Sequence, residues 1–131
     1  MDHAPLVTEE IDEGERLIRE FDKIRSVKAA FWLKENEDDL RYLYIASDEI
    51  EDSSLPGYQA VSNLHRTLGL RWLKLYRIKL IGGDNPLAVA AEELLTKYSV
   101  GLPTWLNGSY FAKRYVQELY LYPIHAASAP S

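Results

Sequence analysis

Cysteine is absent from this chain of 131 residues. Its absence excludes disulfides, thiol nucleophiles and metal sites built on thiolates. Long apolar runs are missing too, since none approaches the roughly 18 residues that a membrane span requires. The start of the chain, Met1–Pro5, carries neither a basic leader nor an apolar signal core. We therefore expect a cytoplasmic protein that makes no membrane contact.

Several catalytic signatures are also missing. The chain has no Gly-x-Ser-x-Gly elbow, no Walker loop and no Gly-x-Gly-x-x-Gly turn, which excludes the common serine-hydrolase and nucleotide-binding motifs. Neither Asp-x-Lys nor Glu-x-Lys occurs, which excludes a nuclease of the restriction-enzyme type. His3, His65 and His125 do not pair at short spacing, so no zinc site is expected. We expect no metal and no cofactor.

What the chain does have is an ordinary globular composition, with 47% hydrophobic and 27% charged residues. Its net charge of −5 is unevenly distributed, because residues 1–65 carry −9 and residues 66–131 carry +4. This asymmetry would allow head-to-tail pairing of molecules or docking of the two halves within one domain. The net negative charge argues against nucleic-acid binding. The acidic runs 35–39 and 48–52 are interpreted as solvated turns.

Hydrophobic periodicity predicts helices and strands along most of the chain. Helices are expected at Thr8–Arg25, Tyr58–Leu68 and Leu87–Tyr98, and strands at Val27–Lys34, Leu40–Ser47, Leu73–Ile81 and Val116–Tyr122. The first two strands form a hairpin in this interpretation. Residues 99–114 contain Gly101, Pro103, Asn107 and Gly108 and are predicted to be an ordered loop.

The predicted order is α-β-β-α-β-α-β. It indicates an α+β two-layer sandwich in which a mixed four-stranded sheet carries all its helices on one face. One domain spans 1–131, with an ordered core over about 8–123 and a mobile tail at 124–131.

Four segments carry a resemblance to a known family. They are Lys28–Trp32, Tyr44–Ser47, Ile78–Ile81 and Glu118–Pro123. In these segments the chain resembles a family of small uncharacterised bacterial α+β proteins. The resemblance implies a bacterial origin and this fold class, and it implies no activity.

Alternation along the strands predicts that the sheet face opposite the helices is aromatic and charged. The residues assigned to this face are Trp32, Tyr42, Tyr44, Arg77, Lys79, Tyr120 and Tyr122. Amphipathic aromatic side chains suit a protein contact. We therefore expect a non-catalytic interaction module that binds a protein partner or a second copy of itself.

In an alternative interpretation, the protein binds a small molecule. This interpretation predicts a binding protein or enzyme whose pocket lies between the sheet and residues 99–114, lined by His65, Trp105, Tyr110 and Arg114. A nucleic-acid module is a third and less favoured possibility, since single-strand binders combine aromatic stacking with a positively charged groove.

Overall fold

The computed structural model describes residues 7–36, 39–97 and 102–123, and the structural statements below concern these residues. The predicted mobile tail at 124–131 lies outside them. The elements follow one another as α1 (Thr8–Asp22), β1 (Ala29–Lys34), β2 (Tyr42–Ser47), α2 (Leu55–Leu68), the 3-10 turn η1 (Leu75–Arg77), β3 (Ile78–Gly82), α3 (Pro86–Lys97), β4 (Thr104–Phe111) and β5 (Arg114–Leu121).

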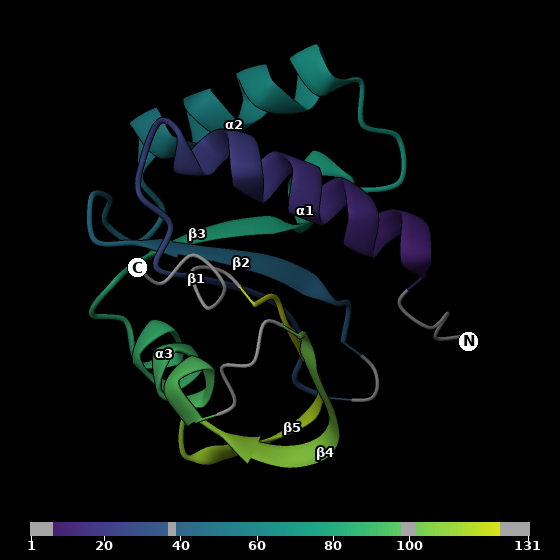
Figure 1. Ribbon diagram of the computed structural model, residues 1–131, viewed down its shortest axis with the longest axis vertical. Coiled ribbons are helices and arrows are strands. Elements are labelled where there is room, and N and C mark those ends of the chain that lie inside the picture. The colour runs from purple at the N-terminus through teal and green to yellow at the C-terminus, as the bar shows by residue number, and fades with distance from the viewer. Residues whose placement is uncertain (1–6, 37–38, 98–101, 124–131) are drawn as a thin grey trace.

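The five strands form one mixed sheet in the order β3-β2-β1-β5-β4 (Figure 1). Strands β2 and β3 are parallel, and the other neighbouring pairs are antiparallel. The parallel pair needs a crossover, and α2 supplies it. The α+β class and the β1–β2 hairpin are therefore confirmed, whereas the expected number of four strands is wrong.

The additional strand is β4, which lies within the stretch that was predicted to be a loop. Asn107 and Gly108 look like a turn in the sequence, but they lie inside β4, where Gly108 has φ 64°. The real turn is Ala112–Lys113, whose φ angles of 54° and 68° are both positive, as a two-residue hairpin turn of type I′ requires. Neither residue is a usual choice there, so the sequence carries no signal of the hairpin.

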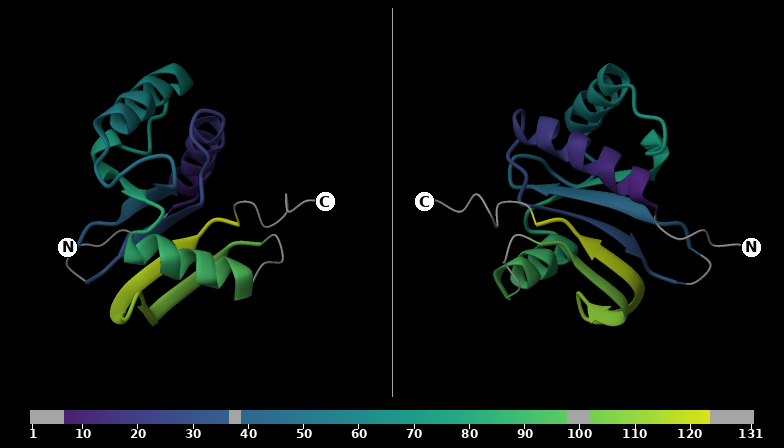
Figure 2. Two further views of the ribbon diagram at one scale, coloured as in Figure 1. Left: turned by 90° about the vertical axis from the view of Figure 1, so that its left-hand side faces the viewer. Right: turned by 45° about the vertical axis from the view of Figure 1, so that its right-hand side comes forward.

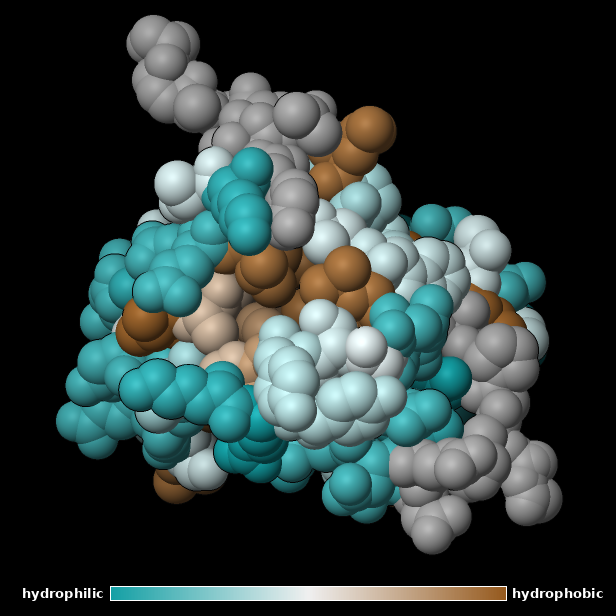
Figure 3. Space-filling model, turned by 90° about the horizontal axis from the view of Figure 1, so that it is seen from below, coloured by the Kyte–Doolittle hydropathy of each residue, from teal (hydrophilic) through white to brown (hydrophobic). Residues whose placement is uncertain are grey.

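Helices cover both faces of the sheet, which corrects the expectation that all lie on one. α1 and α2 pack on one face, while α3 packs on the other, against which the β4–β5 hairpin curls (Figures 1 and 2). As a result, all six residues of β1 are buried. Seen from below, on the side of α3 and the hairpin, apolar residues gather in a hollow flanked by hydrophilic ones (Figure 3).

The face under α1 and α2 contains a buried hydrogen-bonded contact between aromatic side chains. Tyr122 Oη accepts a hydrogen bond from Trp32 Nε1 at 2.9 Å and donates one to the Ile11 carbonyl at 2.8 Å. α1 approaches the hydroxyl so closely that a Cβ on Gly14 would overlap with it. Burial raises the pKa of Tyr122 well above its usual range, so this hydroxyl stays protonated.

The face under α3 is held by aromatic pairs and by one lysine at its rim. Phe31 stacks on Tyr44 at 5.2 Å and meets Phe111 edge-on at 5.4 Å between ring centroids. Lys28 Nζ lies 3.4 Å from Glu92 Oε1 on α3 and 3.6 Å from Asp48 Oδ1 after β2. Lys28 therefore connects α3 to the end of the sheet.

Candidate functional site

The aromatic surface predicted on a single sheet face is divided between the two faces. Trp32, Tyr120 and Tyr122 belong to the core under α1 and α2, whereas Tyr44 belongs to the core under α3. Cross-strand register explains the division, since Trp32 pairs with Leu43 and Phe31 pairs with Tyr44. The prediction of an open face was wrong in this respect, because helices pack on both faces of the sheet.

The other three members of that predicted surface lie near one edge of the sheet. Lys79 Nζ lies 4.2 Å from the centroid of the Tyr42 ring and 6.0 Å from that of Tyr44. Arg77 lies in the 3-10 turn before β3, where its Nη1 donates to the Arg41 carbonyl at 3.2 Å. Only Tyr42, Tyr44 and Lys79 of the seven residues thus form a common aromatic and cationic contact on one face.

The four residues of the alternative pocket do not come together. Trp105, Tyr110 and Arg114 lie on the β4–β5 hairpin at one edge of the sheet, whereas His65 lies on α2, next to β3 at the other edge. Trp105 Nε1 donates to Glu118 Oε2 at 2.7 Å, and Arg114 pairs with Glu35 at 2.7 Å.

A different region concentrates positive charge. Between Ser53 and Gly83 the chain contains no aspartate or glutamate, although it contains Arg66, Arg71, Lys74, Arg77 and Lys79. This stretch comprises α2, β3 and the connection between them. In an acidic protein it forms a local cationic region.

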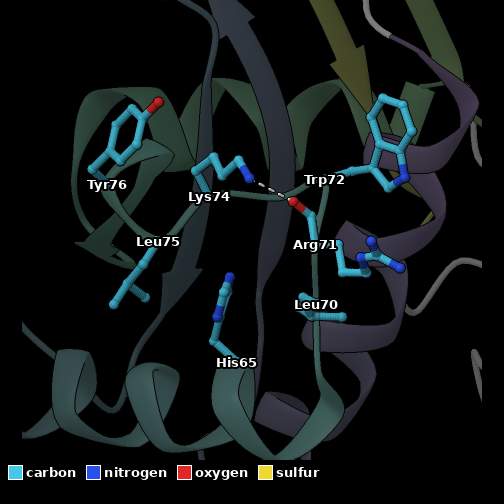
Figure 4. A pocket seen from close by; sticks show the side chains of 7 residues that line it. All are labelled: His65, Leu70, Arg71, Trp72, Lys74, Leu75 and Tyr76. Atoms are coloured by element: carbon cyan, nitrogen blue, oxygen red, sulfur yellow. Dashed lines mark hydrogen bonds between the residues drawn. The ribbon is translucent and has the colours of Figure 1, made fainter.

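The connection between α2 and β3 borders an open groove of about 880 Å³. We call it the α2–β3 groove. The residues that line it are His65, Leu70, Arg71, Trp72, Lys74, Leu75 and Tyr76 (Figure 4). Arg71 and Trp72 point toward α1, Leu75 and Tyr76 lie at the other end, and His65 rises from α2 between them (Figure 4). The side chain of Trp72 is 52% exposed and that of Tyr76 is 70% exposed.

Local sequence explains how the groove begins. Gly69 ends α2 in the left-handed conformation, with φ 64° and its N–H on the Arg66 carbonyl. The next apolar residues, Leu70 and Leu73, turn into the core and are buried. Their burial leaves Arg71 and Trp72 facing outward.

A carboxylate from α1 fixes the same connection. Glu13 accepts hydrogen bonds from the backbone N–H groups of Arg71, Trp72 and Leu73 at 2.7 to 3.1 Å. Burial raises the pKa of Glu13, but these three donors outweigh that effect and hold the pKa below its usual value. The groove therefore has a rigid backbone beneath its exposed side chains.

His65 helps to support the groove. Its Nε2 lies 2.6 Å from the Leu73 carbonyl oxygen, and because a carbonyl only accepts, Nε2 carries the proton. Lys74 Nζ donates to the Arg71 carbonyl at 2.7 Å, which is the dashed line in Figure 4. Both contacts fold the connection back onto itself. The groove is thus preformed.

At the other end of α2 and β3 lies a hollow of opposite charge, with a volume of about 660 Å³. We call it the acidic hollow. The residues that line it are Asp48, Ile50, Glu51, Asp52, Gly83 and Asp84. Asp52 accepts from the Gly82 N–H at 2.8 Å and from Asn85 Nδ2 at 3.0 Å, which fixes the turn before α3. Over the described residues, no three histidine, aspartate or glutamate side chains are arranged to hold a metal ion.

No protein-family model, curated protein or solved structure matches this chain. In the part of the chain that the structure describes, no helix is both long and apolar enough to cross a membrane.

Sequence reasoning missed the principal residues of the α2–β3 groove, which are Arg71, Trp72, Lys74, Leu75 and Tyr76. Residues 73–81 alternate and were interpreted as one strand, whereas β3 begins only at Ile78. The absence of acidic residues from Ser53 to Gly83 was the available signal.

Proposed function

We propose that this protein is a non-catalytic protein-interaction module that binds a segment of a partner protein, with acidic and apolar side chains, in the α2–β3 groove. The observation that carries the proposal is the pair of exposed aromatic side chains, Trp72 and Tyr76, held beside Arg71 and Lys74 on a fixed backbone.

Aromatic residues at a fixed position are effective anchors for a protein partner. Tryptophan, tyrosine and arginine dominate the energetics of protein interfaces, since each combines a large apolar surface with a polar group. The three hydrogen bonds to Glu13 already hold the connection in place. Binding therefore requires little further ordering of the backbone, which favours affinity.

The positive charge around the groove indicates that the partner segment is acidic. Arg71 and Lys74 lie on the groove, and the flanking stretch from Ser53 to Gly83 contributes no negative charge. Complementary charges at the rim of an interface accelerate association and reject partners of the wrong sign. The net charge of −5 on the whole chain favours an acidic peptide over a nucleic acid, whose dense phosphates the rest of the surface would repel.

Fluorescence anisotropy tests the proposal with a labelled peptide that alternates glutamate with leucine, and with a matched peptide that alternates lysine with leucine. We expect the first peptide to bind and the second not to. Trp72→Ala should weaken binding about 10-fold or more, as the loss of an aromatic anchor does.

Tyr110→Ala provides the matched control, because Tyr110 is 78% exposed on the β4–β5 hairpin, away from the groove. It should bind like the wild-type protein. Equal binding of both peptides, or an equal loss in Trp72→Ala and Tyr110→Ala, would contradict the proposal.

A further inference from the structure

The chain itself contains a segment with the chemistry that the α2–β3 groove would recognise. Residues 48–55 read Asp-Glu-Ile-Glu-Asp-Ser-Ser-Leu and run from the end of β2 to the first residue of α2. The final leucine, Leu55, is 68% exposed. Most of the acidic hollow belongs to this segment.

The segment and the groove lie at opposite ends of the same structural unit. α2 begins beside the acidic residues and ends at Gly69, where the connection that lines the groove starts. In Figure 1 the two ends of α2 and β3 lie on opposite sides of the molecule. A single molecule therefore cannot bring its own segment into its own groove.

We propose that the α2–β3 groove of one molecule binds the acidic segment 48–55 of a second copy, so that the protein assembles head to tail. This inference rests on the proposed function and names its partner. Arg71 and Lys74 meet the acidic hollow of the next molecule, and Leu55 of that molecule packs against Trp72.

The charged groups needed for this contact are available. Glu51 and Asp84 of the acidic hollow are both exposed. Asp48 shares the hollow and lies 3.6 Å from Lys28, so part of its charge is already balanced. Glu51 and Asp84 are therefore the carboxylates through which the neighbour attracts Arg71 and Lys74.

The geometry of the contact determines the kind of assembly. Each molecule contributes two different surfaces, so the interface is heterologous and every added molecule leaves one groove and one segment unoccupied. Such contacts produce chains or closed rings, and they do not stop at a twofold dimer. The assembly should grow with protein concentration and should weaken at about 1 M salt, where the Debye length is about 3 Å.

Analytical ultracentrifugation of two charge-reversal variants tests this arrangement. The groove variant carries Arg71→Glu and Lys74→Glu, and the hollow variant carries Glu51→Lys and Asp84→Lys. Each variant alone should be monomeric at concentrations where the wild-type protein assembles. All four positions are exposed, and circular dichroism should confirm that both variants keep the wild-type fold.

Mixing the two variants provides the decisive measurement. The groove variant retains an acidic segment that fits the basic groove of the hollow variant, and its reversed groove fits the reversed hollow. The mixture should therefore assemble through both contacts, with the two variants alternating. A chain with all four reversals has an acidic groove and a basic hollow and should assemble again. Leu55→Ala should weaken wild-type assembly without altering the charge.

Three results would overturn the inference. They are a wild-type protein that stays monomeric at low salt, assembly that persists in either variant alone, and a mixture of the two variants that does not assemble. If the wild-type protein is monomeric but its groove still binds the glutamate–leucine peptide, the proposed function holds and only the identity of the partner is wrong. If the wild-type protein neither assembles nor binds the peptide, both the proposed function and this inference are wrong.

Discussion

The two faces of the sheet are stabilised in different ways. Under α1 and α2, the packing is so close that Gly14 leaves room only for the Tyr122 hydroxyl, which bonds to Trp32. Under α3, Phe31 contacts two aromatic rings, and the charged Lys28 lies at the rim. The first face depends on shape and hydrogen bonding, and the second on aromatic stacking and charge. This difference predicts which substitutions each face tolerates.

The largest expected effect is on the face under α3. Phe31→Ala removes a fully buried ring together with its contacts to Tyr44 and Phe111, and it should lower the free energy of unfolding by about 3–5 kcal/mol. Urea denaturation measures the loss. Tyr115→Ala, on the exposed hairpin, should cost much less, and equal losses would contradict the assignment of Phe31 to the core.

The face under α1 should show a coupled effect of the next size. Gly14→Ala places a Cβ against the Tyr122 hydroxyl and should cost about 1–3 kcal/mol, although alanine favours helices. Tyr122→Phe alone should also destabilise, because the buried Trp32 Nε1–H loses its acceptor. In the double variant the missing hydroxyl leaves room for the Cβ.

The two losses should therefore not add, and a double-mutant cycle by chemical denaturation measures the coupling. Simple additivity of Gly14→Ala and Tyr122→Phe would show that the close contact is unimportant.

A smaller effect is expected at the rim under α3. Lys28→Met keeps the aliphatic chain but removes the ammonium group that faces Glu92 and Asp48. Because both carboxylates are exposed to solvent, the loss should be at most about 1 kcal/mol near neutral pH. Burial lowers the pKa of Lys28, but Glu92 and Asp48 outweigh it, so the pKa lies above its usual 10.5.

The contribution of Lys28 is therefore fully present below pH 10.5 and is lost as the pH rises through the folded-state pKa. The difference in stability between Lys28→Met and the wild-type protein should shrink at strongly alkaline pH. A difference that stays constant there would exclude the ionic contribution.

The smallest effect concerns Glu13, which holds the α2–β3 groove. Its pKa is lowered from 4.5, so its contribution is present above that pH and is lost as the pH falls through the folded-state value. Partial contact with water limits this contribution to less than about 1 kcal/mol. In Glu13→Gln, the free energy of unfolding should fall less steeply as the pH is lowered into the acid range. Hydrogen exchange at the backbone amide of Trp72 should also become faster.

Local patterns in the sequence were sufficient for part of the fold. The three helices and the β1–β2 hairpin were predicted because their periodicity is strong. β4 was not predictable, because the turn at Ala112–Lys113 lacks the glycine or asparagine that usually marks positive φ.

The candidate site was harder to predict because it depends on distant parts of the chain. Which face Trp32 occupies follows from its pairing with Leu43, and the choice between the faces needs the register. Glu13 lies 58 residues before Arg71, so no local pattern connects them. The position of the Trp72 backbone depends on that contact.

The pairing of β1 with β5 also has a consequence for folding during synthesis on the ribosome. α1, β1, β2, α2 and β3 are synthesised first, but the central strand β1 keeps one side unpaired until β5 emerges. An unpaired strand with apolar residues on both faces invites pairing with other nascent chains. Rapid closure of β4 and β5, which are neighbours in sequence, would therefore protect the growing chain from aggregation.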